Sequence, residues 1–353
     1  MDAKEEALRA LVQALPAWYC KAARDLPWRR DRDPYHIWIS EIMLQQTRVE
    51  AVRGYYMRFL DALPDIAALA AAPEEQVLKL WEGLGYYSRA RNLQKAARVI
   101  AGTYGGIFPS DYAAIRVLPG IGDYTAGAIA SICYGLPTPA VDGNVLRVCA
   151  RVCAIEEPVD RPAVKKGIAL ALTRAYPRTG CGTLTQALME LGATVCTPRS
   201  PRCAGCPAQA FCAGYRAGIA QQLPVRSPKR EKRVEIRTVF LFYCGSALAL
   251  EKRPDEGLLA GLWQLPNVEG ECTLDGAFAA AQAYGLVPER PLWERRREHI
   301  FTHIRWKMHA YAIAVRAEAP GFAWVQPEDL EAGYALPTAF RQFLEDTPGT
   351  AGR

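Results

Sequence analysis

The stretch LPGIGDYTAGAIAS, residues 118–131, places Gly120 and Gly122 in a short turn directly before a predicted helix. Such a turn exposes backbone N–H groups beside the positive end of the helix dipole, and this arrangement suits a phosphate group. A Gly-x-Gly turn before a helix occurs in many proteins, so on its own it is weak evidence for phosphate binding.

The residues that precede this turn strengthen the interpretation. The sequence DYAAIRVLPG, residues 111–120, reads as a short helix that leads into the turn. Residues 111–134 therefore predict a helix–hairpin–helix, which is a much stronger sign of contact with a DNA backbone. The DNA-binding residues that we expect in this motif are Gly120, Gly122 and Thr125.

The length and charge of the chain set broad limits on its function. Its 353 residues allow about two domains with separate cores. The formal net charge of +6 permits a polyanionic partner but does not require one. The first residues, MDAKEEALRALVQALPAWY, combine acids with an amphipathic period, unlike a secretory signal. No apolar run approaches the roughly 20 residues of a membrane span, so we expect a soluble protein of the cytoplasm.

Two parts of the chain carry different periodic patterns. Residues 1–222 read as a succession of helices, whereas residues 223–233, LPVRSPKREKR, combine prolines with a basic run and read as a linker. Residues 234–353 contain VEIRTVFLFYC, ALALEKR and KMHAYAIAV, which are typical of strands, and FAAAQAYGL (278–286), which is typical of a helix. The predicted fold class is multidomain, with an all-α domain followed by a smaller α+β domain.

Helix boundaries are also visible in the sequence. Asp33 and Pro34 form an N-cap followed by proline at the first helical position. Thr47 and Glu50 form a capping-box pattern that predicts the start of the next helix, which would extend to about residue 59. Gln46 then lies at the junction of two helices, where its side chain can project outward. Further helices are expected near residues 73–82, 88–101, 124–134, 143–153, 162–176 and 183–192.

The eleven cysteines fall into two groups. Seven are scattered, and we interpret them as small buried hydrophobic residues: Cys20, Cys133, Cys149, Cys153, Cys181, Cys244 and Cys272. The other four are spaced C-x6-C-x2-C-x5-C in an irregular loop, 196–212: Cys196, Cys203, Cys206 and Cys212. Disulfides or unrelated thiols are weaker interpretations than a shared metal centre. The spacing does not separate zinc from iron–sulfur, but a single C-x2-C pair favours a [4Fe–4S] cluster.

Two carboxylates are candidates for chemistry. Glu41 lies in WISEIMLQQT on an apolar helix face, where an acid is either a satisfied structural group or a tuned catalytic group. Asp142 lies in AVDGNVLR at the start of a predicted helix, where it could be a plain N-cap. The residues alone leave both alternatives open.

The chain resembles the adenine DNA glycosylases (the MutY type) of the helix–hairpin–helix superfamily in five ordered segments: SEIMLQQT, GLGYYSRARNL, LPGIGDYTAGAI, AVDGNVLRV and the four-cysteine loop. The resemblance covers residues 20–225. It implies hydrolysis of the N-glycosidic bond of adenine mispaired with 8-oxoguanine or guanine, after the base is flipped out. It implies that Glu41 is the general acid and that Asp142 stabilises an oxocarbenium-like sugar, with Tyr124 and Asn144 bracing this centre.

The same resemblance assigns the cysteine loop and the lack of lyase activity. It implies that Cys196, Cys203, Cys206 and Cys212 hold a [4Fe–4S] cluster. Arg199 and Arg202, which lie between these cysteines, could meet DNA phosphates. Lyase-competent relatives carry a lysine in the turn before the second hairpin helix, and this chain has GDYT there. We therefore expect an essentially monofunctional glycosylase.

The residues after the linker resemble, more weakly, the family's Nudix-like domain. Because FAAAQAYGL contains no acid, we expect a reader of 8-oxoguanine without hydrolase activity. Phe301, Thr302 and His303 stand where the family has Phe-Ser-His. Gln46 and Tyr86 match positions that fill or wedge the base stack. The implied partner is double-stranded DNA with A·8-oxoguanine or A·G mispairs, bound by a monomer without a membrane.

Two other functions remain open at this point. The first is a glycosylase of the same superfamily that acts on oxidised pyrimidines or on thymine opposite guanine. The second is a non-catalytic iron–sulfur protein that binds DNA or senses redox state. The absence of lysine beside Tyr124 disfavours action on oxidised pyrimidines, and the extra domain disfavours both glycosylase alternatives. The presence of both Glu41 and Asp142 disfavours a sensor.

Overall fold

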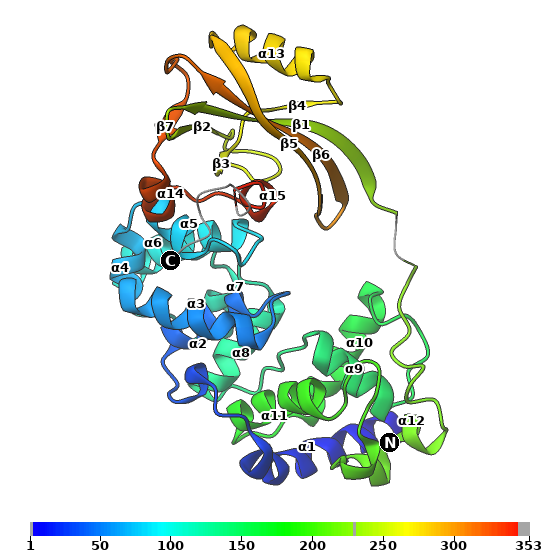
Figure 1. Ribbon diagram of the computed structural model, residues 1–353. Coiled ribbons are helices and arrows are strands. Elements are labelled where there is room, and N and C mark those ends of the chain that lie inside the picture. The colour runs from blue at the N-terminus through cyan, green and yellow to red at the C-terminus, as the bar shows by residue number, and fades with distance from the viewer. Residues whose placement is uncertain (1–2, 229–230, 345–353) are drawn as a thin grey trace. The chain divides into compact units, whose positions relative to one another are not determined.

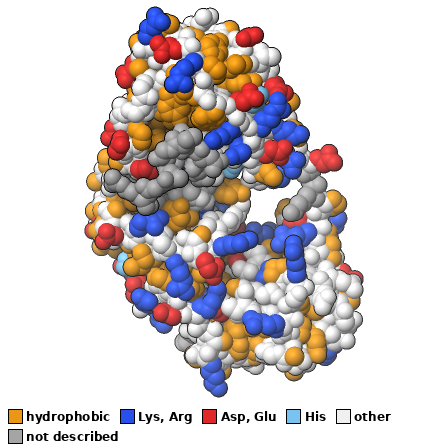
Figure 2. Space-filling view, viewed as in Figure 1, with side chains coloured by type: hydrophobic (Ala, Val, Ile, Leu, Met, Phe, Trp, Pro, Cys, Tyr) orange, Lys and Arg blue, Asp and Glu red, His pale blue; other side chains and the backbone are white. Residues whose placement is uncertain are grey.

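The computed structural model describes residues 3–228 and 231–344, which divide into two compact units (Figure 1). Of the described residues, 3–72 and 92–228 form unit 1, and 73–91 and 231–344 form unit 2. Residues 73–91 thus pack with the C-terminal part of the chain, although they precede the segment 223–233 in sequence. On the face drawn in Figure 2, Lys and Arg side chains are interspersed with Asp and Glu on both units.

Unit 1 is helical throughout its described residues. Its elements are α1 (Ala3–Ala22), η1 (Pro27–Arg29), α2 (Pro34–Met43), α3 (Val49–Ala62), α4 (Ile66–Ala71), α6 (Ser88–Thr103), α7 (Tyr112–Arg116), α8 (Asp123–Tyr134), α9 (Gly143–Val152), α10 (Pro162–Ala175), α11 (Cys181–Thr194), η2 (Cys203–Gly205), η3 (Gln209–Phe211) and α12 (Ala213–Arg216). Helix α6 begins in unit 2 and continues into unit 1. In the part of the chain that the structure describes, no helix is long and apolar enough to cross a membrane.

The largest apolar cluster of unit 1 joins helices that are far apart in sequence. Leu11 and Leu15 of α1 are completely buried against residues of α9, α10 and α11, including Val148, Leu172 and Leu188. The N-terminal helix therefore closes the same core as the helices that follow residue 143. Burial of these side chains is the main favourable contribution to folding of this unit.

The predicted helix–hairpin–helix is present. Helix α7 ends at Arg116, and α8 begins at Asp123 with Gly122 as its N-cap residue. Gly120 has a φ of 74°, and a Cβ there would lie 2.5 Å from the Cβ of Asn92. The turn consequently requires glycine at 120 for both its backbone conformation and its space.

The predicted helix caps have different outcomes. The carboxylate of Asp33 accepts a hydrogen bond from the backbone N–H of Tyr35 at 2.7 Å, as expected for the N-cap of α2. The predicted capping box is wrong, because α3 starts at Val49 with no side-chain cap. The hydroxyl of Thr47 instead donates to the carbonyl of Gln45 at 3.4 Å.

Unit 2 contains a mixed sheet, which in the described residues has seven strands. The strands are β1 (Arg233–Cys244), β2 (Ala247–Lys252), β3 (Trp263–Gln264), β4 (Asn267–Glu269), β5 (Pro288–Ile300), β6 (Ile304–Val315) and β7 (Ala323–Val325). The main order is β3-β2-β1-β6-β5, while β4 pairs with β1 and β7 with β2. Strands β1 and β6 are parallel, and β5 pairs antiparallel with β6.

Alternate residues of β1 face different apolar layers. Phe240 and Phe242 pack toward α13 (Leu274–Ala283), which covers one face of the sheet in Figure 1. Val239 and Leu241 pack on the other face with α14 (Pro327–Gly333) and α15 (Thr338–Arg341). The remaining helix of this unit, α5 (Glu74–Leu80), comes from the segment 73–91.

Three expectations are corrected by the structure. Strand β5 was not predicted, because its sequence PERPLWERRREHI is rich in charges that an edge strand can leave in solvent. Helix α13 starts at Leu274 rather than near residue 278, and it therefore contains one acid, Asp275. Cys20 is exposed rather than buried, and Cys133, Cys244 and Cys272 are only half-buried, whereas Cys149, Cys153 and Cys181 are buried as expected.

Candidate active site

Four of the predicted site residues meet in one pocket of unit 1, with a volume of about 160 Å³. They are Glu41 from α2, Tyr124 from α8, and Asp142 and Asn144 from the start of α9. The pocket is also lined by Arg24, Leu26, Trp28, Arg29, Ile37, Leu44, Thr47, Val49, Ile132, Gln186, Met189 and Ala193. The motifs that were recognised separately in the sequence thus converge on a single site.

Glu41 is a buried carboxyl group, with 5% of the residue exposed. The hydroxyl of Tyr124 donates a hydrogen bond to its Oε2. Burial raises the pKa of Glu41 to about 7, the Tyr124 hydrogen bond opposes this rise, and the negative charge of Asp142 adds to it. The carboxyl is therefore poised to hold or release a proton near neutral pH.

Asp142 is the N-cap of α9, as the simpler interpretation of the sequence had it. Its Oδ1 accepts from the backbone N–H of Val145 at 2.7 Å, and its Oδ2 accepts from Nδ2 of Asn144 at 2.8 Å. Burial raises the pKa of Asp142, while these hydrogen bonds oppose the rise. The carboxylate is thus held in one orientation beside Glu41 in the same pocket.

Asn144 is oriented from both ends of its amide. Its Oδ1 accepts from Nη2 of Arg147 at 2.8 Å, and the same nitrogen donates to the carbonyl of Gly192 on α11. A Cβ at position 192 would lie only 2.5 Å from the Cβ of Asn144. Helices α9 and α11 therefore approach each other closely at the residue that braces Asp142.

Two polar residues were missed in the sequence: Gln186, which lines the pocket, and Glu190, which lies behind two lining arginines. Glu190 of α11 has no exposed surface and accepts hydrogen bonds from Arg24 and Arg29, both of which line the pocket. Gln186 accepts a hydrogen bond from the hydroxyl of Tyr19 at 2.9 Å. An acid in the apolar stretch ALMELGATV is the same signal that singled out Glu41, and it could have identified Glu190.

The three predicted DNA-binding residues of the hairpin differ in exposure. Gly120 and Gly122 are exposed, so the turn can approach a ligand through its backbone. Thr125 is buried, and its hydroxyl accepts a hydrogen bond from Nε2 of Gln45 at 3.3 Å. Its candidate contact with DNA is therefore the backbone N–H in the first turn of α8. Gln46 is exposed between α2 and α3, with a φ of 60°.

A second pocket, in unit 2, brings together the three predicted residues of the opposite-base reader and Tyr86, which is predicted to fill or wedge the base stack. Tyr86, Phe301, Thr302 and His303 line it, and the Tyr86 hydroxyl lies 3.0 Å from Oγ1 of Thr302. Tyr86 is 45% exposed and has a φ of 48°. Residues 301–303 connect β5 to β6, and Nζ of Lys232 donates to the carbonyl of Phe301 at 2.6 Å.

The segment that carries Tyr86 is tied to the C-terminal part of unit 2 by partly buried polar contacts. Nζ of Lys79 donates to the carbonyls of Leu330 and Tyr334 at 3.0 and 3.1 Å. The carboxylate of Glu82 accepts from the backbone N–H of Leu336 and from Arg341. These contacts hold the neighbouring residue Tyr86 within reach of the β5–β6 connection.

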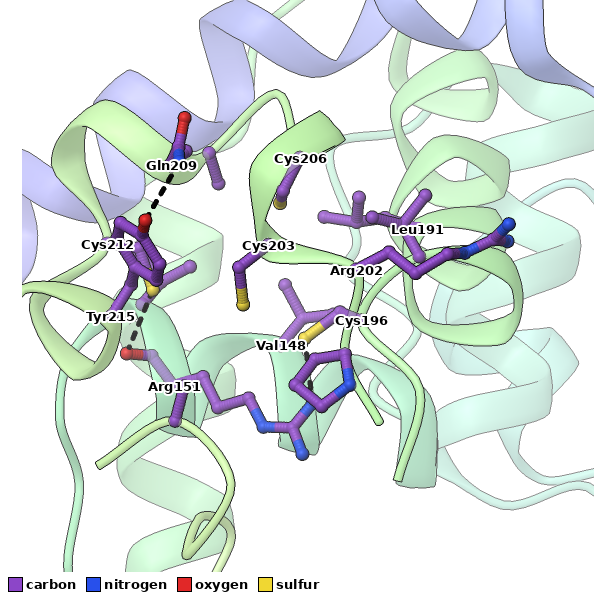
Figure 3. Close-up of a pocket in the computed structure, with 15 residues that line it drawn as sticks. Val148, Arg151, Leu191, Cys196, Arg202, Cys203, Cys206, Gln209, Cys212 and Tyr215 are labelled. Carbon is purple, nitrogen blue, oxygen red and sulfur yellow. Dashed lines mark hydrogen bonds between the residues drawn. The ribbon is translucent and has the colours of Figure 1, made fainter. Parts of the chain in front are cut away.

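The four clustered cysteines line one further pocket in unit 1 (Figure 3). Nη1 of Arg151 donates to Sγ of Cys196 at 3.2 Å, and Sγ of Cys212 lies 3.4 Å from the carbonyl of Arg151. Burial, together with the charges of the other three thiols, raises the pKa of Cys206 to about 11, and a backbone hydrogen bond from Ala208 opposes the rise. A donor set of thiols alone suits zinc or an iron–sulfur cluster.

The four thiols of this pocket do not have the spacing of metal ligands. Within residues 3–228 and 231–344, no group of three or more potential ligands is close enough to hold a metal ion. All eleven cysteines lie within the described residues, and none of them forms a disulfide. Arg199 and Arg202 are exposed, and Arg202 donates to the carbonyl of Thr194 beside the cysteine pocket. The residues fit a cluster by their chemistry, and the loop brings all four to the same pocket.

Two family descriptions match the chain. Residues 39–169 match the "HhH-GPD superfamily base excision DNA repair protein", and residues 238–346 match the "NUDIX domain". The first match contains the second half of α2, the hairpin and α9, while the second contains most of the sheet of unit 2. The predicted fold class, a helical domain followed by a Nudix-like domain, is thereby confirmed.

Similar proteins of known name are adenine DNA glycosylases. That of Mus musculus is 35% identical over 95% of this chain and 78% of the mouse protein. That of Homo sapiens is 33% identical over 96% of this chain and 74% of the human protein. That of Mycolicibacterium smegmatis is 41% identical over 62% of this chain and 76% of the mycobacterial protein.

Among solved structures, a thermostable thymine-DNA glycosylase has a TM-score of 0.55 and 29% identity, covering 61% of this chain and 100% of its own. An endonuclease III–DNA complex has a TM-score of 0.52 at 23% identity, covering 61% of this chain and 98% of its own, and shows the shared fold.

Replacing Tyr124 by phenylalanine should raise the pKa of Glu41 above about 7, because the lost hydrogen bond stabilises the ionised carboxylate. The carboxyl would then stay protonated to higher pH. A carbon NMR titration of glutamate side chains measures this, with Glu41→Gln assigning the signal. Tyr134→Phe is the matched control on α8, since the Tyr134 hydroxyl donates to the carbonyl of Phe108. An unchanged or lower pKa in Tyr124→Phe would contradict the prediction.

Proposed function

The chain belongs to the adenine DNA glycosylases of base excision repair, and we propose that it excises adenine paired with 8-oxoguanine or guanine by general-acid-assisted hydrolysis. The observation that carries this mechanism is the buried Glu41 beside Asp142, with its pKa raised to about 7. Both adenine-specific relatives named first span more than nine-tenths of this chain, whereas the thymine-DNA glycosylase structure covers 61% of it. Adenine is therefore the base that we assign.

Glu41 is the proton donor in this proposal. Adenine leaves poorly as an anion, so a proton must reach a ring nitrogen as the C1′–N9 bond breaks and its electron pair goes to the base. A carboxyl with an ordinary pKa would be ionised at neutral pH, but burial keeps much of Glu41 protonated there. Tyr124 orients the carboxyl through its hydroxyl.

Asp142 stabilises the sugar in this proposal. Departure of the base leaves positive charge at C1′ and the ring oxygen, and a fixed carboxylate lowers the energy of that state. Val145 and Asn144 donate to both oxygens of Asp142 and hold it in place before the charge develops. A water molecule then adds to C1′ and releases a proton.

The helix–hairpin–helix and two exposed side chains serve DNA binding and base flipping. Backbone N–H groups at Gly120 and Gly122 and in the first turn of α8 are suited to a phosphate. Gln46 and Tyr86 are exposed and adopt left-handed backbone conformations that are unusual for residues other than glycine. Such strain often marks functional positions, and we assign both side chains to filling the stack around the flipped base.

The loop of Phe301, Thr302 and His303 is the reader of the opposite base in this proposal. Adenine itself is undamaged, so the partner base must supply the signal. The Phe301 ring packs against His299 and Trp306 with centroids 4.6 and 4.9 Å away. Thr302 and His303 are exposed and can hydrogen-bond to base edges that differ between guanine and 8-oxoguanine.

A [4Fe–4S] cluster held by Cys196, Cys203, Cys206 and Cys212 is our proposal for the cysteine pocket. Its role there is structural, because it would tie together an irregular loop and present Arg199 and Arg202 to DNA phosphates. We assign no chemical step to it. The turn before α8 contains Tyr124 and no lysine, so we expect no efficient strand cleavage by Schiff-base chemistry.

Glu41→Gln removes the transferable proton and keeps the shape of the side chain. We expect duplex binding close to that of the parent protein and adenine release reduced at least about 100-fold. Asp142→Asn should behave similarly, because it deletes the charge that faces the sugar. Single-turnover excision from an A·8-oxoguanine duplex measures both, with the exposed Glu50→Gln of α3 as the control. Excision above a tenth of the parent rate in Glu41→Gln would remove it from the acid role.

Anaerobically purified protein should be yellow-brown and contain about four irons per chain with little zinc. Cys203→Ser should lower iron content, soluble yield and DNA affinity more than it lowers the excision rate of bound substrate. Cys20→Ser is the matched control, because Cys20 is exposed on α1 and outside the cysteine pocket. Zinc at about one per chain without iron would overturn the cluster assignment.

Thr302→Ala combined with His303→Ala should reduce the preference for A·8-oxoguanine over A·G by about 5- to 150-fold, since a good polar base contact contributes about 1–3 kcal/mol of discrimination. Excision from A·G at saturating enzyme should hardly change. Single-turnover rates on both duplexes give the preference, and alanine at both Glu298 and Arg305 of the same hairpin is the control. An unchanged preference would exclude this loop as the reader, and an equal loss on both duplexes would mean a structural role.

A further inference from the structure

Glu190 is a completely buried carboxylate that none of the steps above uses. It lies on α11, and its Oε1 accepts from Nε of Arg24 at 2.8 Å while its Oε2 accepts from Nη2 of Arg24 at 3.0 Å and Nη2 of Arg29 at 2.8 Å. Burial alone would raise the pKa of Glu190, but the hydrogen bonds from both arginines lower it below its ordinary value. A negative charge therefore stays in the interior beside two positive ones.

The guanidinium of Arg29 is fixed from three sides. It donates to Glu190, it donates through Nη1 to the carbonyl of Arg24 at 3.4 Å, and it lies 5.5 Å from the ring centroid of Tyr19. Arg29 also lines the pocket that contains Glu41. Among the described residues, Arg29 forms its ion pair with Glu190 and none with Glu41.

Several charged or titratable groups face Glu41 from the surrounding elements. Tyr124 of α8 donates to it, Asp142 at the start of α9 opposes its ionisation, and Arg29 of η1 favours its ionisation. Cys133 of α8 is close enough for the charge of Glu41 to raise the pKa of its thiol, which burial raises most. Arg29 is the cation in this set, and its charge lowers the pKa of Glu41 against the larger effect of burial.

We infer that Glu190 is a positioning residue that holds Arg29 away from Glu41 and thereby preserves the proton that Glu41 donates. The inference rests on the proposed role of Glu41 as the general acid. Without the charge of Glu190, the Arg29 guanidinium would lose its anionic partner and turn toward the nearest remaining carboxyl groups in the pocket. An ion pair there would favour ionised Glu41, which has no proton to donate.

The charge of Arg29 lowers the pKa of Glu41, and this sign determines how the excision rate depends on pH. The general acid works in its protonated form, so the excision rate falls as pH rises through the pKa of Glu41. More positive charge near Glu41 lowers that pKa, so the basic limb of the profile moves to lower pH. Removing the charge of Arg29 has the opposite effect, and the basic limb moves to higher pH.

The test is the pH profile of single-turnover excision at saturating enzyme, measured with full-length protein on an A·8-oxoguanine duplex. Glu190→Gln should move the midpoint of the basic limb down by about one pH unit, and Arg29→Met should move it up. In the double variant Glu190→Gln with Arg29→Met, the downward shift should disappear. Arg174→Met is the control, because it removes an exposed arginine that pairs with Glu5 and does not line the pocket.

The outcomes separate this inference from the proposed function. A Glu190→Gln profile that is lower at every pH, with an unmoved midpoint, would mean a purely structural role and overturn the inference. If Glu190→Gln does not fold, an Arg29→Met midpoint that stays in place or moves down would overturn it. An active Glu41→Gln variant would instead refute the general acid itself, whatever happens at position 190.

Discussion

Burial of the Glu41 carboxyl group is the constraint on which the arrangement of unit 1 depends. An ionised carboxylate in an apolar helix face is costly, so the group either keeps its proton or finds donors. Tyr124 supplies the donor, and it is the second residue of α8, directly after the glycine turn. The turn that is suited to a phosphate therefore also sets the hydroxyl that orients the acid. In the proposed mechanism, DNA contact and proton transfer therefore depend on one structural element.

In unit 2, the exposed aromatic residue Tyr86 lies beside the exposed loop of residues 301–303. Tyr86 comes from a segment that lies far from β5 and β6 in sequence, yet its hydroxyl meets Thr302. Lys79 and Glu82 bind backbone and side-chain groups of the last helices in this unit, so the segment is anchored just before Tyr86. The aromatic ring can then remain exposed without being freely mobile.

Local patterns in the sequence predicted most of the helices and the strands β1, β2 and β6, because apolar periodicity and Asp33 with Pro34 act over short distances. The capping box failed because the backbone at Gln46 turns into a left-handed conformation. Strand β5 failed because its charges are tolerated only at an edge. The motifs identified Glu41 and Asp142, but the pairing of Glu190 with Arg29 spans 161 residues and is a tertiary event that no local pattern encodes.

The close approach at Gly192 has a consequence for how the chain can vary. Glycine within a helix costs about 1 kcal/mol relative to alanine, so α11 gives up some of its own stability at this position. In return, the backbone of α9 reaches a distance that even a methyl group would prevent, and Asn144 keeps its place against Asp142. The lack of a side chain at Gly192 therefore helps to align the candidate active site. Even a methyl group at this position, which lies outside the pocket lining, would push on Asn144 and displace the carboxylate of Asp142.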